Sequence, residues 1–279
     1  MNWENPSVAQ QLLFATVRLE TRDASDQPLS VGTSFVLAHE FVPGKPELFL
    51  VSNKHVVDGA ASALLYFTRR ASHGGPSVGD TFFVRIDDFA LQWHGHPDSN
   101  ADVAVYPLGW QLDLIERGGE TPYLMRLSST MLISAEAADA ADPFMPVVFV
   151  GYPNGLFDEK NYTPILRQAT LATPLGLDFC GDPVFLIDGS VFPGSSGSPV
   201  YSYDLSIKGQ IIDIRLIGIL SAVFTQADTG DIVIEPAPVR TRPVVAFRQI
   251  IDLGVVMQAR LIREAIEDFG RAQLRQAST

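Results

Sequence analysis

The sequence contains a single cysteine, Cys180, among 279 residues, so no disulfide can form within the chain. Secreted proteins of this size commonly carry several disulfides, and the scarcity of cysteine therefore favours a reducing compartment. The N-terminal segment lacks a basic stretch followed by an apolar core, so we expect no signal peptide. No apolar run approaches the length of a membrane span, and we expect a cytoplasmic protein without a membrane partner.

The sequence also lacks an excess of positive charge. Its 20 Lys and Arg residues stand against 32 Asp and Glu residues, which gives a formal net charge of −12. Binding to nucleic acid requires clustered basic side chains that neutralise phosphates, so we expect no nucleic-acid partner. The five histidines and one cysteine show no zinc-binding spacing, and we predict no metal ion and no organic cofactor.

Turn residues between short apolar runs are abundant. The 22 Gly and 19 Pro residues favour an all-β fold over a helical one. Alternating or continuously apolar stretches predict strands at residues 12–21, 30–38, 48–52, 63–68, 81–87, 88–94, 102–108, 146–151, 164–172, 183–187, 198–203, 211–223, 232–235 and 239–247. A helical turn is expected at residues 112–117.

The C-terminal segment follows a different pattern. From Leu253 to Gln276, apolar residues recur at helical spacing with Arg and Glu between them. The apolar positions are Val256, Met257, Leu261, Ile262, Ala265, Ile266 and Phe269. We expect an amphipathic helix that docks on the second half of the chain, with a protein-contact helix as the alternative.

Residues 188–200 read Asp-Gly-Ser-Val-Phe-Pro-Gly-Ser-Ser-Gly-Ser-Pro-Val. A serine on a tight turn bracketed by glycines is well placed for nucleophilic attack, because the turn exposes the hydroxyl and brings backbone amides beside it. Ser195 and Ser196 are both candidates for this nucleophile. The alternative interpretation is a Gly/Ser-rich surface loop between strands.

A histidine and an aspartate occupy comparable positions at the ends of predicted strands. His55 follows the apolar strand at 48–52, where a rigid scaffold can direct the ring into a cleft. Asp102 opens an apolar strand after a polar loop, where a carboxylate can be partly buried and orient a histidine. A structural histidine and a strand-capping aspartate are the alternatives, and Asp98 is a competing carboxylate in the same loop.

Three motifs together resemble those of chymotrypsin-fold serine proteases. They are Ser-Asn-Lys-His-Val-Val-Asp-Gly (52–59), Asp-Val-Ala-Val (102–105) and Pro-Gly-Ser-Ser-Gly-Ser-Pro-Val (193–200), in the chain order of that family. The first and third are most similar in wording to bacterial glutamyl endopeptidases. The run from Asp188 and Ile-Gly-Ile-Leu-Ser-Ala-Val (217–223) resemble high-temperature-requirement proteases.

This resemblance implies two Greek-key six-stranded β-barrels with the active site between them. The expected N-terminal barrel covers residues 1–110 and carries His55 and Asp102. Residues 111–143 would connect the barrels, residues 144–250 would form the barrel that carries Ser196, and residues 251–279 would hold the C-terminal helix.

The resemblance also implies a role for each site residue. Ser196 would be the nucleophile, His55 the general base and acid, and Asp102 the carboxylate that orients it. Ser196 is preferred to Ser195 because the motif places glycine directly after the nucleophile. The backbone amides of Gly194 and Ser196 would form the oxyanion hole. The substrate would be a protein or peptide, and activity should fall at acid pH as His55 takes up a proton.

The residue six before the nucleophile lies at the base of the specificity pocket in this family. Here it is Ser190, which is uncharged. Further substrate-binding residues implied by the resemblance are Gly218, Ser221, Ala222 and Val223. We expect a preference for small or medium apolar residues before the scissile bond, unless Asp188 reaches the pocket and favours a basic residue. The chain has no histidine after His96, so the glutamate specificity of glutamyl endopeptidases is not expected.

Activation should differ from that of zymogen-type relatives. In those proteins an aspartate precedes the nucleophile and pairs with a new N-terminal amine, whereas Ser195 occupies that position here. We therefore expect that N-terminal cleavage does not activate the protein, and that a flip of the Pro193–Gly194 peptide could control the oxyanion hole. The expected function is a regulated intracellular processing protease with an activating or target protein partner. The alternative is a catalytically silent module that binds peptides.

Overall fold

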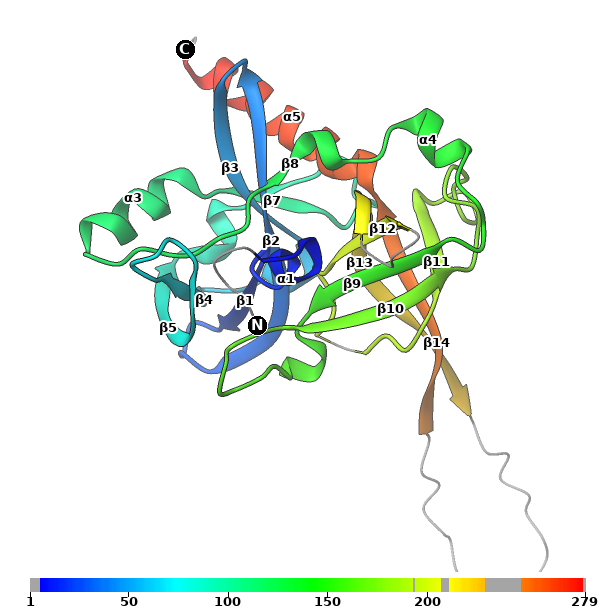
Figure 1. The fold of residues 1–279 in the computed structure, drawn as a ribbon, viewed down its shortest axis with the longest axis horizontal. Coiled ribbons are helices and arrows are strands. Elements are labelled where there is room, and N and C mark those ends of the chain that lie inside the picture. Colours follow the sequence, from blue (N-terminus) through cyan, green and yellow to red (C-terminus); the bar gives the residue numbers. More distant parts are fainter. Residues whose placement is uncertain (1–5, 193, 207–210, 229–246, 278–279) are drawn as a thin grey trace, which may run out of the picture.

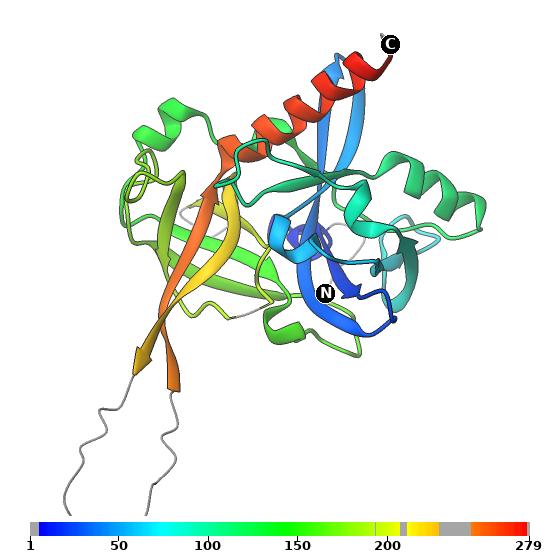
Figure 2. The same cartoon turned by 180° about the vertical axis from the view of Figure 1, so that it is seen from behind.

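The computed structural model describes residues 6–192, 194–206, 211–228 and 247–277. Its secondary structure is mostly β, arranged as two sheets side by side, which confirms the predicted all-β class (Figure 1). A long C-terminal helix extends from the second sheet across to the first, and the reverse view shows its full length (Figure 2).

The N-terminal sheet contains the strands that carry His55 and Asp102 at their ends. Its strands pair in the order β5-β4-β1-β2-β3-β7-β6, and β8 pairs with β2 in parallel. The strands are β1 (Thr16–Arg22), β2 (Pro28–Val42), β3 (Lys45–Ser52), β4 (Ser62–Arg70), β5 (Pro76–Asp87), β6 (His94–Gly95), β7 (Ala104–Pro107) and β8 (Leu127–Ser128). The expected six strands are recognisable as β1 to β5 and β7, because β6 and β8 add only two residues each. The two end strands of this order, β5 and β6, do not pair with each other.

The C-terminal sheet is a closed barrel in the order β10-β11-β14-β13-β12-β9, as expected. The strands are β9 (Pro146–Gly151), β10 (Ile165–Leu171), β11 (Val184–Asp188), β12 (Pro199–Leu205), β13 (Ile211–Asp228) and β14 (Phe247–Gln258). The strand predicted at residues 232–235, and nearly all of the one predicted at 239–247, lie outside the described residues.

The helices are short except for the last. They are α1 (Val8–Leu12), α2 (Lys54–Val57), α3 (Gly109–Arg117), α4 (Ala135–Asp139) and α5 (Ala259–Ala277), with 3-10 turns η1 (Phe89–Gln92), η2 (Ser129–Met131) and η3 (Pro153–Gly155). The helical turn predicted at 112–117 is part of α3. Within the described ranges, no helix is both long and apolar enough to cross a bilayer.

The C-terminal helix begins later than its sequence pattern predicts. The sequence pattern predicts a helix from Leu253, but β14 continues to Gln258 and α5 starts at Ala259. Residues 253–257 pair with β11 along their whole length, so barrel closure takes precedence over local periodicity. Short apolar runs fit a strand and a helix equally well, which explains the misplaced start.

The strand predicted at residues 88–94 is also wrong over most of its length. Asp88 adopts a left-handed conformation with φ 50°, and a 3-10 turn follows instead. The amides of Phe89 and Ala90 donate to Ala61 O and Ala60 O at 3.2 and 3.1 Å. The fully buried ring of Phe89 then anchors the turn, so only β6 remains extended.

The segment between the two sheets contacts both of them. β8 pairs with β2 of the first sheet, and Leu132 bridges to Leu216 on β13 of the second. The amide of Ile133 donates to Leu216 O at 3.0 Å. A shared apolar cluster also joins both sheets and α5, since it contains Phe35, Tyr201 and Ile262. The connecting segment and the shared cluster therefore link the two sheets directly. The expected domain boundaries stay a prediction.

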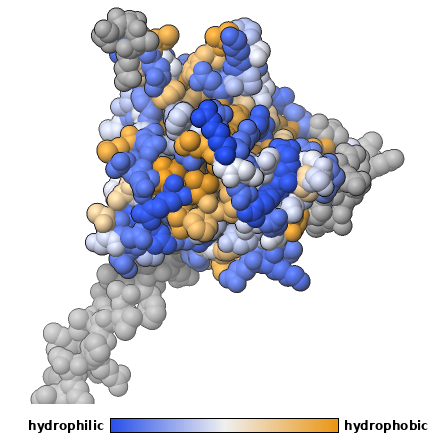
Figure 3. All heavy atoms as spheres, turned by 90° about the vertical axis from the view of Figure 1, so that its left-hand side faces the viewer, coloured by the Kyte–Doolittle hydropathy of each residue, from blue (hydrophilic) through white to orange (hydrophobic). Residues whose placement is uncertain are grey.

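The surface to which α3 and β5 belong carries an apolar patch among polar side chains (Figure 3). Exposed apolar residues on these two elements are Phe83, Trp110 and Leu114. A shallow groove between the elements is lined in part by Phe82 and Ile115. None of the predicted site residues lines this groove.

Candidate active site

His55 and Asp102 are brought together by the ends of β3 and the approach to β7. The buried side chain of Asn53, the N-cap residue of α2, donates from Nδ2 to Asp102 O at 2.7 Å. The backbone amide of His55 donates to Asp102 Oδ1 at 3.1 Å, and His55 Nδ1 lies 2.6 Å from Oδ2. The two residues are therefore joined through backbone and side chain. Asp98 has no such contact with His55; its carboxylate accepts from the amide of Asn100.

The Asp102 carboxyl is the acceptor in this pair. Burial acts to raise the pKa of Asp102, but the hydrogen bonds from His55 and Ser221 outweigh burial and hold the pKa below its usual value. Because an ionised carboxylate can only accept, His55 Nδ1 carries the proton and Nε2 is left as the basic nitrogen. His55 remains about half exposed, at 51% of its side chain, and Asp102 is more enclosed, at 21%. His55 is thus the more exposed member of the pair, and the charged carboxylate of Asp102 is the more enclosed one.

Ser196 joins the same network through Ser221. The Ser196 hydroxyl donates to Ser221 O at 3.0 Å, and the Ser221 hydroxyl donates to Asp102 Oδ2 at 2.6 Å. Among the described residues no hydrogen bond joins Ser196 Oγ to His55. Hydrogen bonds between catalytic groups are often long or poorly aligned in structures without substrate, so this geometry does not exclude a catalytic pairing. Ser221 was predicted only as a substrate-binding residue, and its hydroxyl contact with Asp102 is an additional finding.

The loop that carries Ser196 is fixed by glycines and by the other sheet. Gly194 and Gly197 have φ values of 84° and 87°, a region that side chains with a Cβ rarely adopt. A Cβ on Gly197 would also overlap Thr33 O. The amide of Thr33 on β2 donates to Ser196 O at 3.0 Å, and the amide of Gly197 donates to Leu220 O at 2.8 Å. The serine turn is therefore held between β2 of one half and β13 of the other.

The two candidate nucleophiles differ in exposure. Ser195 is buried at 1% exposure, and its hydroxyl has no hydrogen-bond partner among the described residues. Ser196 is only partly buried, and its hydroxyl donates to Ser221 O. Pro193 lies outside the described residues, so the expected flip at the Pro193–Gly194 peptide stays a prediction.

The predicted specificity residues lie at three places in the C-terminal barrel. Ser190 follows β11 and is half-buried, and Asp188 at the end of that strand is exposed. Ala222 is exposed and Val223 half-buried on β13, directly after Ser221. Gly218 lies deeper in the barrel, where a Cβ would meet Met257 O, Val256 and Phe185. The atoms around Gly218 therefore belong to the barrel core and not to the serine turn.

Sequence reasoning missed two residues that support the site. Thr33 binds the serine turn through its amide, and its hydroxyl accepts from the amide of Tyr152 at 3.2 Å. Asn53 supports the Asp102 backbone. Asn53 lies within the histidine motif, which is a signal that could have identified it. The amide of Thr33 could come from almost any residue type, and its hydroxyl contacts the backbone of Tyr152, 119 positions away, so the sequence carries no local signal for Thr33. Within the described residues, no three His, Cys, Asp or Glu side chains gather to hold a metal ion.

Comparison with known proteins gives structural matches only. No family model and no curated protein matches the sequence. Two solved structures to which the chain is similar are both of Rv3671c from M. tuberculosis. The Rv3671c protease in its active form shares 19% identity, with 95% of this chain and 84% of that chain covered, at a TM-score of 0.48. The inactive form of a serine-to-alanine mutant shares 19% identity over 97% and 93%, at a TM-score of 0.45.

Proposed function

We propose that this protein is a serine endopeptidase that hydrolyses peptide bonds through an acyl-enzyme on Ser196. The observation that carries the proposal is the contact of 2.6 Å between His55 Nδ1 and Asp102 Oδ2, in a network that reaches Ser196 through Ser221. A serine hydroxyl is a poor nucleophile until a base removes its proton, and this network supplies an oriented base.

In the first half-reaction the Ser196 hydroxyl turns from Ser221 O towards His55. Its proton passes to His55 Nε2 while Oγ attacks the scissile carbonyl carbon. The tetrahedral intermediate collapses as the imidazolium donates that proton to the leaving amine, and the acyl group stays on Oγ. Asp102 remains ionised throughout and stabilises the charge on the ring.

In the second half-reaction water takes the place of the leaving amine. His55 removes a proton from water, the hydroxide oxygen attacks the ester carbonyl, and the proton returns to Ser196 Oγ as the acid product leaves. The amides of Gly194 and Ser196 would donate to the oxyanion in both halves. Donors of this kind stabilise the transition state by roughly 3–4 kcal/mol each.

The substrate proposed for this site is an extended peptide. Ala222 and Val223 follow the β-bulge at Ser221 and would pair with the substrate backbone as an added strand. Ser190 offers no charge to the residue before the scissile bond, so we propose a preference for small or medium apolar side chains. The scarcity of cysteine motivates the further proposal that the protein processes a partner protein in the cytoplasm.

The proposal is tested by intact mass after treatment with a fluorophosphonate, on wild type, Ser196→Ala and Ser195→Ala. One adduct on wild type and Ser195→Ala, with none on Ser196→Ala, would support an activated Ser196. An adduct that follows Ser195 instead would overturn the assignment of the nucleophile.

The alternative function is a peptide-binding module that does not cut. It is favoured by one observation, the Ser196 hydroxyl that donates to Ser221 O rather than to His55. Wild type that takes no adduct, yet binds an apolar peptide through the β13 edge, would favour this alternative. Wild type that cleaves the peptide would exclude it.

A further inference from the structure

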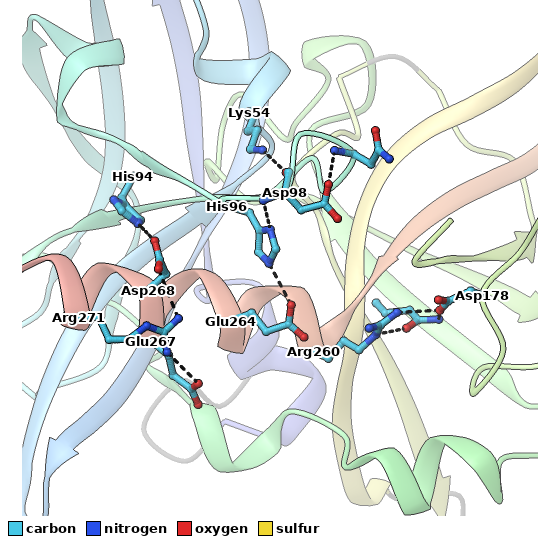
Figure 4. A network of polar contacts seen from close by, with 12 residues as sticks. Lys54, His94, His96, Asp98, Asp178, Arg260, Glu264, Glu267, Asp268 and Arg271 are labelled. Carbon is cyan, nitrogen blue, oxygen red and sulfur yellow. Dashed lines mark hydrogen bonds and ion pairs between the residues drawn. The ribbon is translucent and has the colours of Figure 1, made fainter. Parts of the chain in front are cut away.

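The loop that leads into Asp102 is anchored at its base by His96. The side chain of this histidine is 5% exposed, and His96 belongs to no set of site residues predicted from the sequence. Its amide donates to Val103 O at 2.8 Å, which closes the loop directly behind Asp102. Its ring lies between the amide of Asp98, 3.1 Å from Nδ1, and Glu264 Oε2 of α5, 3.1 Å from Nε2 (Figure 4).

These two contacts define the protonation state of the ring. The Asp98 amide can only donate, so His96 Nδ1 is the acceptor and carries no proton. The proton is therefore on Nε2, where it is donated to the Glu264 carboxylate. The contact with Glu264 thus selects the tautomer that the loop needs. A catalytic histidine likewise donates from one ring nitrogen to a carboxylate. In His96, however, the other nitrogen accepts a hydrogen bond from a backbone amide.

The same loop is also linked to His55. Lys54, the residue before His55, donates from Nζ to Asp98 O at 2.7 Å. The amide of Ala101 donates to the same carbonyl at 3.2 Å. The backbone of Asp98 is therefore held at two points. Its amide donates to His96 Nδ1, and its carbonyl accepts from Lys54 Nζ. A displacement of this loop would move Asp102 and the start of α2 together.

Helix α5 supports the loop over more than one turn. Ile262 and Ala265 belong to the same buried cluster as Ala101 and Val103, the two neighbours of Asp102. One turn beyond Glu264, Asp268 accepts from His94 Nε2 at 2.9 Å (Figure 4). The helix thus shares an apolar cluster with the end of the loop and forms two histidine–carboxylate pairs, one with His96 and one with His94 of β6.

We propose that His96 is a positioning residue that holds Asp102 in place against His55. Glu264 keeps His96 in the required tautomer, so α5 is part of the catalytic unit. The inference rests on the proposed function, because it assumes that His55 and Asp102 act on Ser196. Misplacement of a reacting group by about 1 Å can cost up to about a hundredfold in rate. A loss of this pair should therefore lower turnover far more than it lowers substrate binding.

The test compares variants of Glu264 with a matched control on the same helix. Glu264→Gln keeps an acceptor oxygen, Glu264→Ala removes it, and Glu267→Ala removes an exposed carboxylate whose ion pair is with Arg271 at 4.0 Å. His96→Asn keeps an acceptor for the Asp98 amide but cannot reach Glu264. The measurements are kcat and KM for peptide cleavage, and the low-field proton NMR signal of His55 Nδ1–H.

We expect Glu264→Ala and His96→Asn to lower kcat by about tenfold with KM changed less than about twofold. Glu264→Gln should recover most of the loss, and Glu267→Ala should match wild type. If Glu264→Ala lowers only the melting temperature and leaves kcat unchanged, the pair is merely structural and the proposal is wrong.

The NMR signal separates this proposal from the proposed function. If wild type shows no cleavage and no fluorophosphonate adduct, the proposed function fails, but the His55 proton signal can still be followed. A shift or loss of that signal in Glu264→Ala, absent in Glu267→Ala, would support the positioning role on its own. An unchanged signal would overturn it.

Discussion

The hydroxyl of Ser221 donates a hydrogen bond to Asp102 Oδ2 across 2.6 Å, on the same oxygen that His55 Nδ1 contacts. One carboxylate oxygen thus accepts hydrogen bonds from Ser221 on β13 and from the imidazole of His55. A hydrogen bond to a charged group contributes about 1.5–3 kcal/mol, so Ser221 takes part in setting the charge of the site.

Replacement of this hydroxyl should raise the pKa of Asp102. In Ser221→Ala one of the hydrogen bonds that hold the Asp102 pKa down is removed, so the pKa moves up from its lowered value. The contact stabilises the fold above the carboxyl's unfolded pKa of about 3.9, and this contribution is lost as pH falls through the lowered folded pKa. Carbon-13 NMR of the Asp102 carboxyl measures the shift, and kcat should fall by about tenfold. Ser221→Thr keeps a hydroxyl, so its kcat should fall less. Equal titration curves of Asp102 in Ser221→Ala and wild type would contradict the role of Ser221 in lowering this pKa.

Gly197→Ala should disrupt the serine turn. Its φ of 87° strains any side chain, and the new Cβ would overlap Thr33 O. We expect a loss of more than about 2 kcal/mol in the free energy of unfolding, with loss of fluorophosphonate labelling. Gly109→Ala is the control, because no atom of the described residues lies within 4 Å of its Cβ position at the start of α3. Urea denaturation of both variants measures the difference, and equal stabilities would show that the turn adapts.

Tyr201→Phe should leave the protein as stable as wild type or make it more stable. The ring is fully buried in the cluster shared by both halves, and its hydroxyl has no hydrogen-bond partner among the described residues. Burial also raises the pKa of this phenol. Removal of an unpaired buried hydroxyl relieves a desolvation cost of about 1–3 kcal/mol. Tyr203→Phe, which loses an acceptor for Gln168 Nε2 at 2.8 Å, should instead be slightly destabilising in the same denaturation experiment.

Ser190→Asp should change the cleavage profile. Wild type should favour small or medium apolar residues before the scissile bond, and a carboxylate at this position should add cleavage after Lys and Arg. A peptide library read by mass spectrometry measures both profiles. Asp188→Asn is the control and should leave the wild-type profile unchanged, since Asp188 is exposed at the end of β11. Wild-type cleavage after basic residues that Asp188→Asn abolishes would reverse the assignment of the pocket.

The sequence predicts those features that depend on local residue type. His55 and Asp102 are recognisable because each lies in a short motif at a strand end, and the structure brings them into contact. The start of α5 was missed because Leu253 to Met257 suit a strand and a helix equally, and only pairing with β11 decides between them. The β-class follows from alternation and turn residues, whereas the path of the N-terminal sheet depends on contacts between distant segments.

The parts of the site that were not predicted are those made by backbone atoms or by residues far apart in sequence. The amide of Thr33 holds Ser196 O, and any residue except proline could supply that amide. His96 and Glu264 are 168 positions apart, so neither one marks the other in a single sequence. Such contacts become visible only when the packing of both sheets is known.

The separation of the partners along the chain determines when the site can first exist. Ser221 is 119 positions from the aspartate it contacts, and Thr33 is 161 positions from Gly194, whose carbonyl it binds. A chain still attached to the ribosome and ending before Ser221 lacks one side of the network, and contacts this distant in sequence also form slowly. Any peptidase activity would therefore begin only after Ser221 has been synthesised and has left the ribosome.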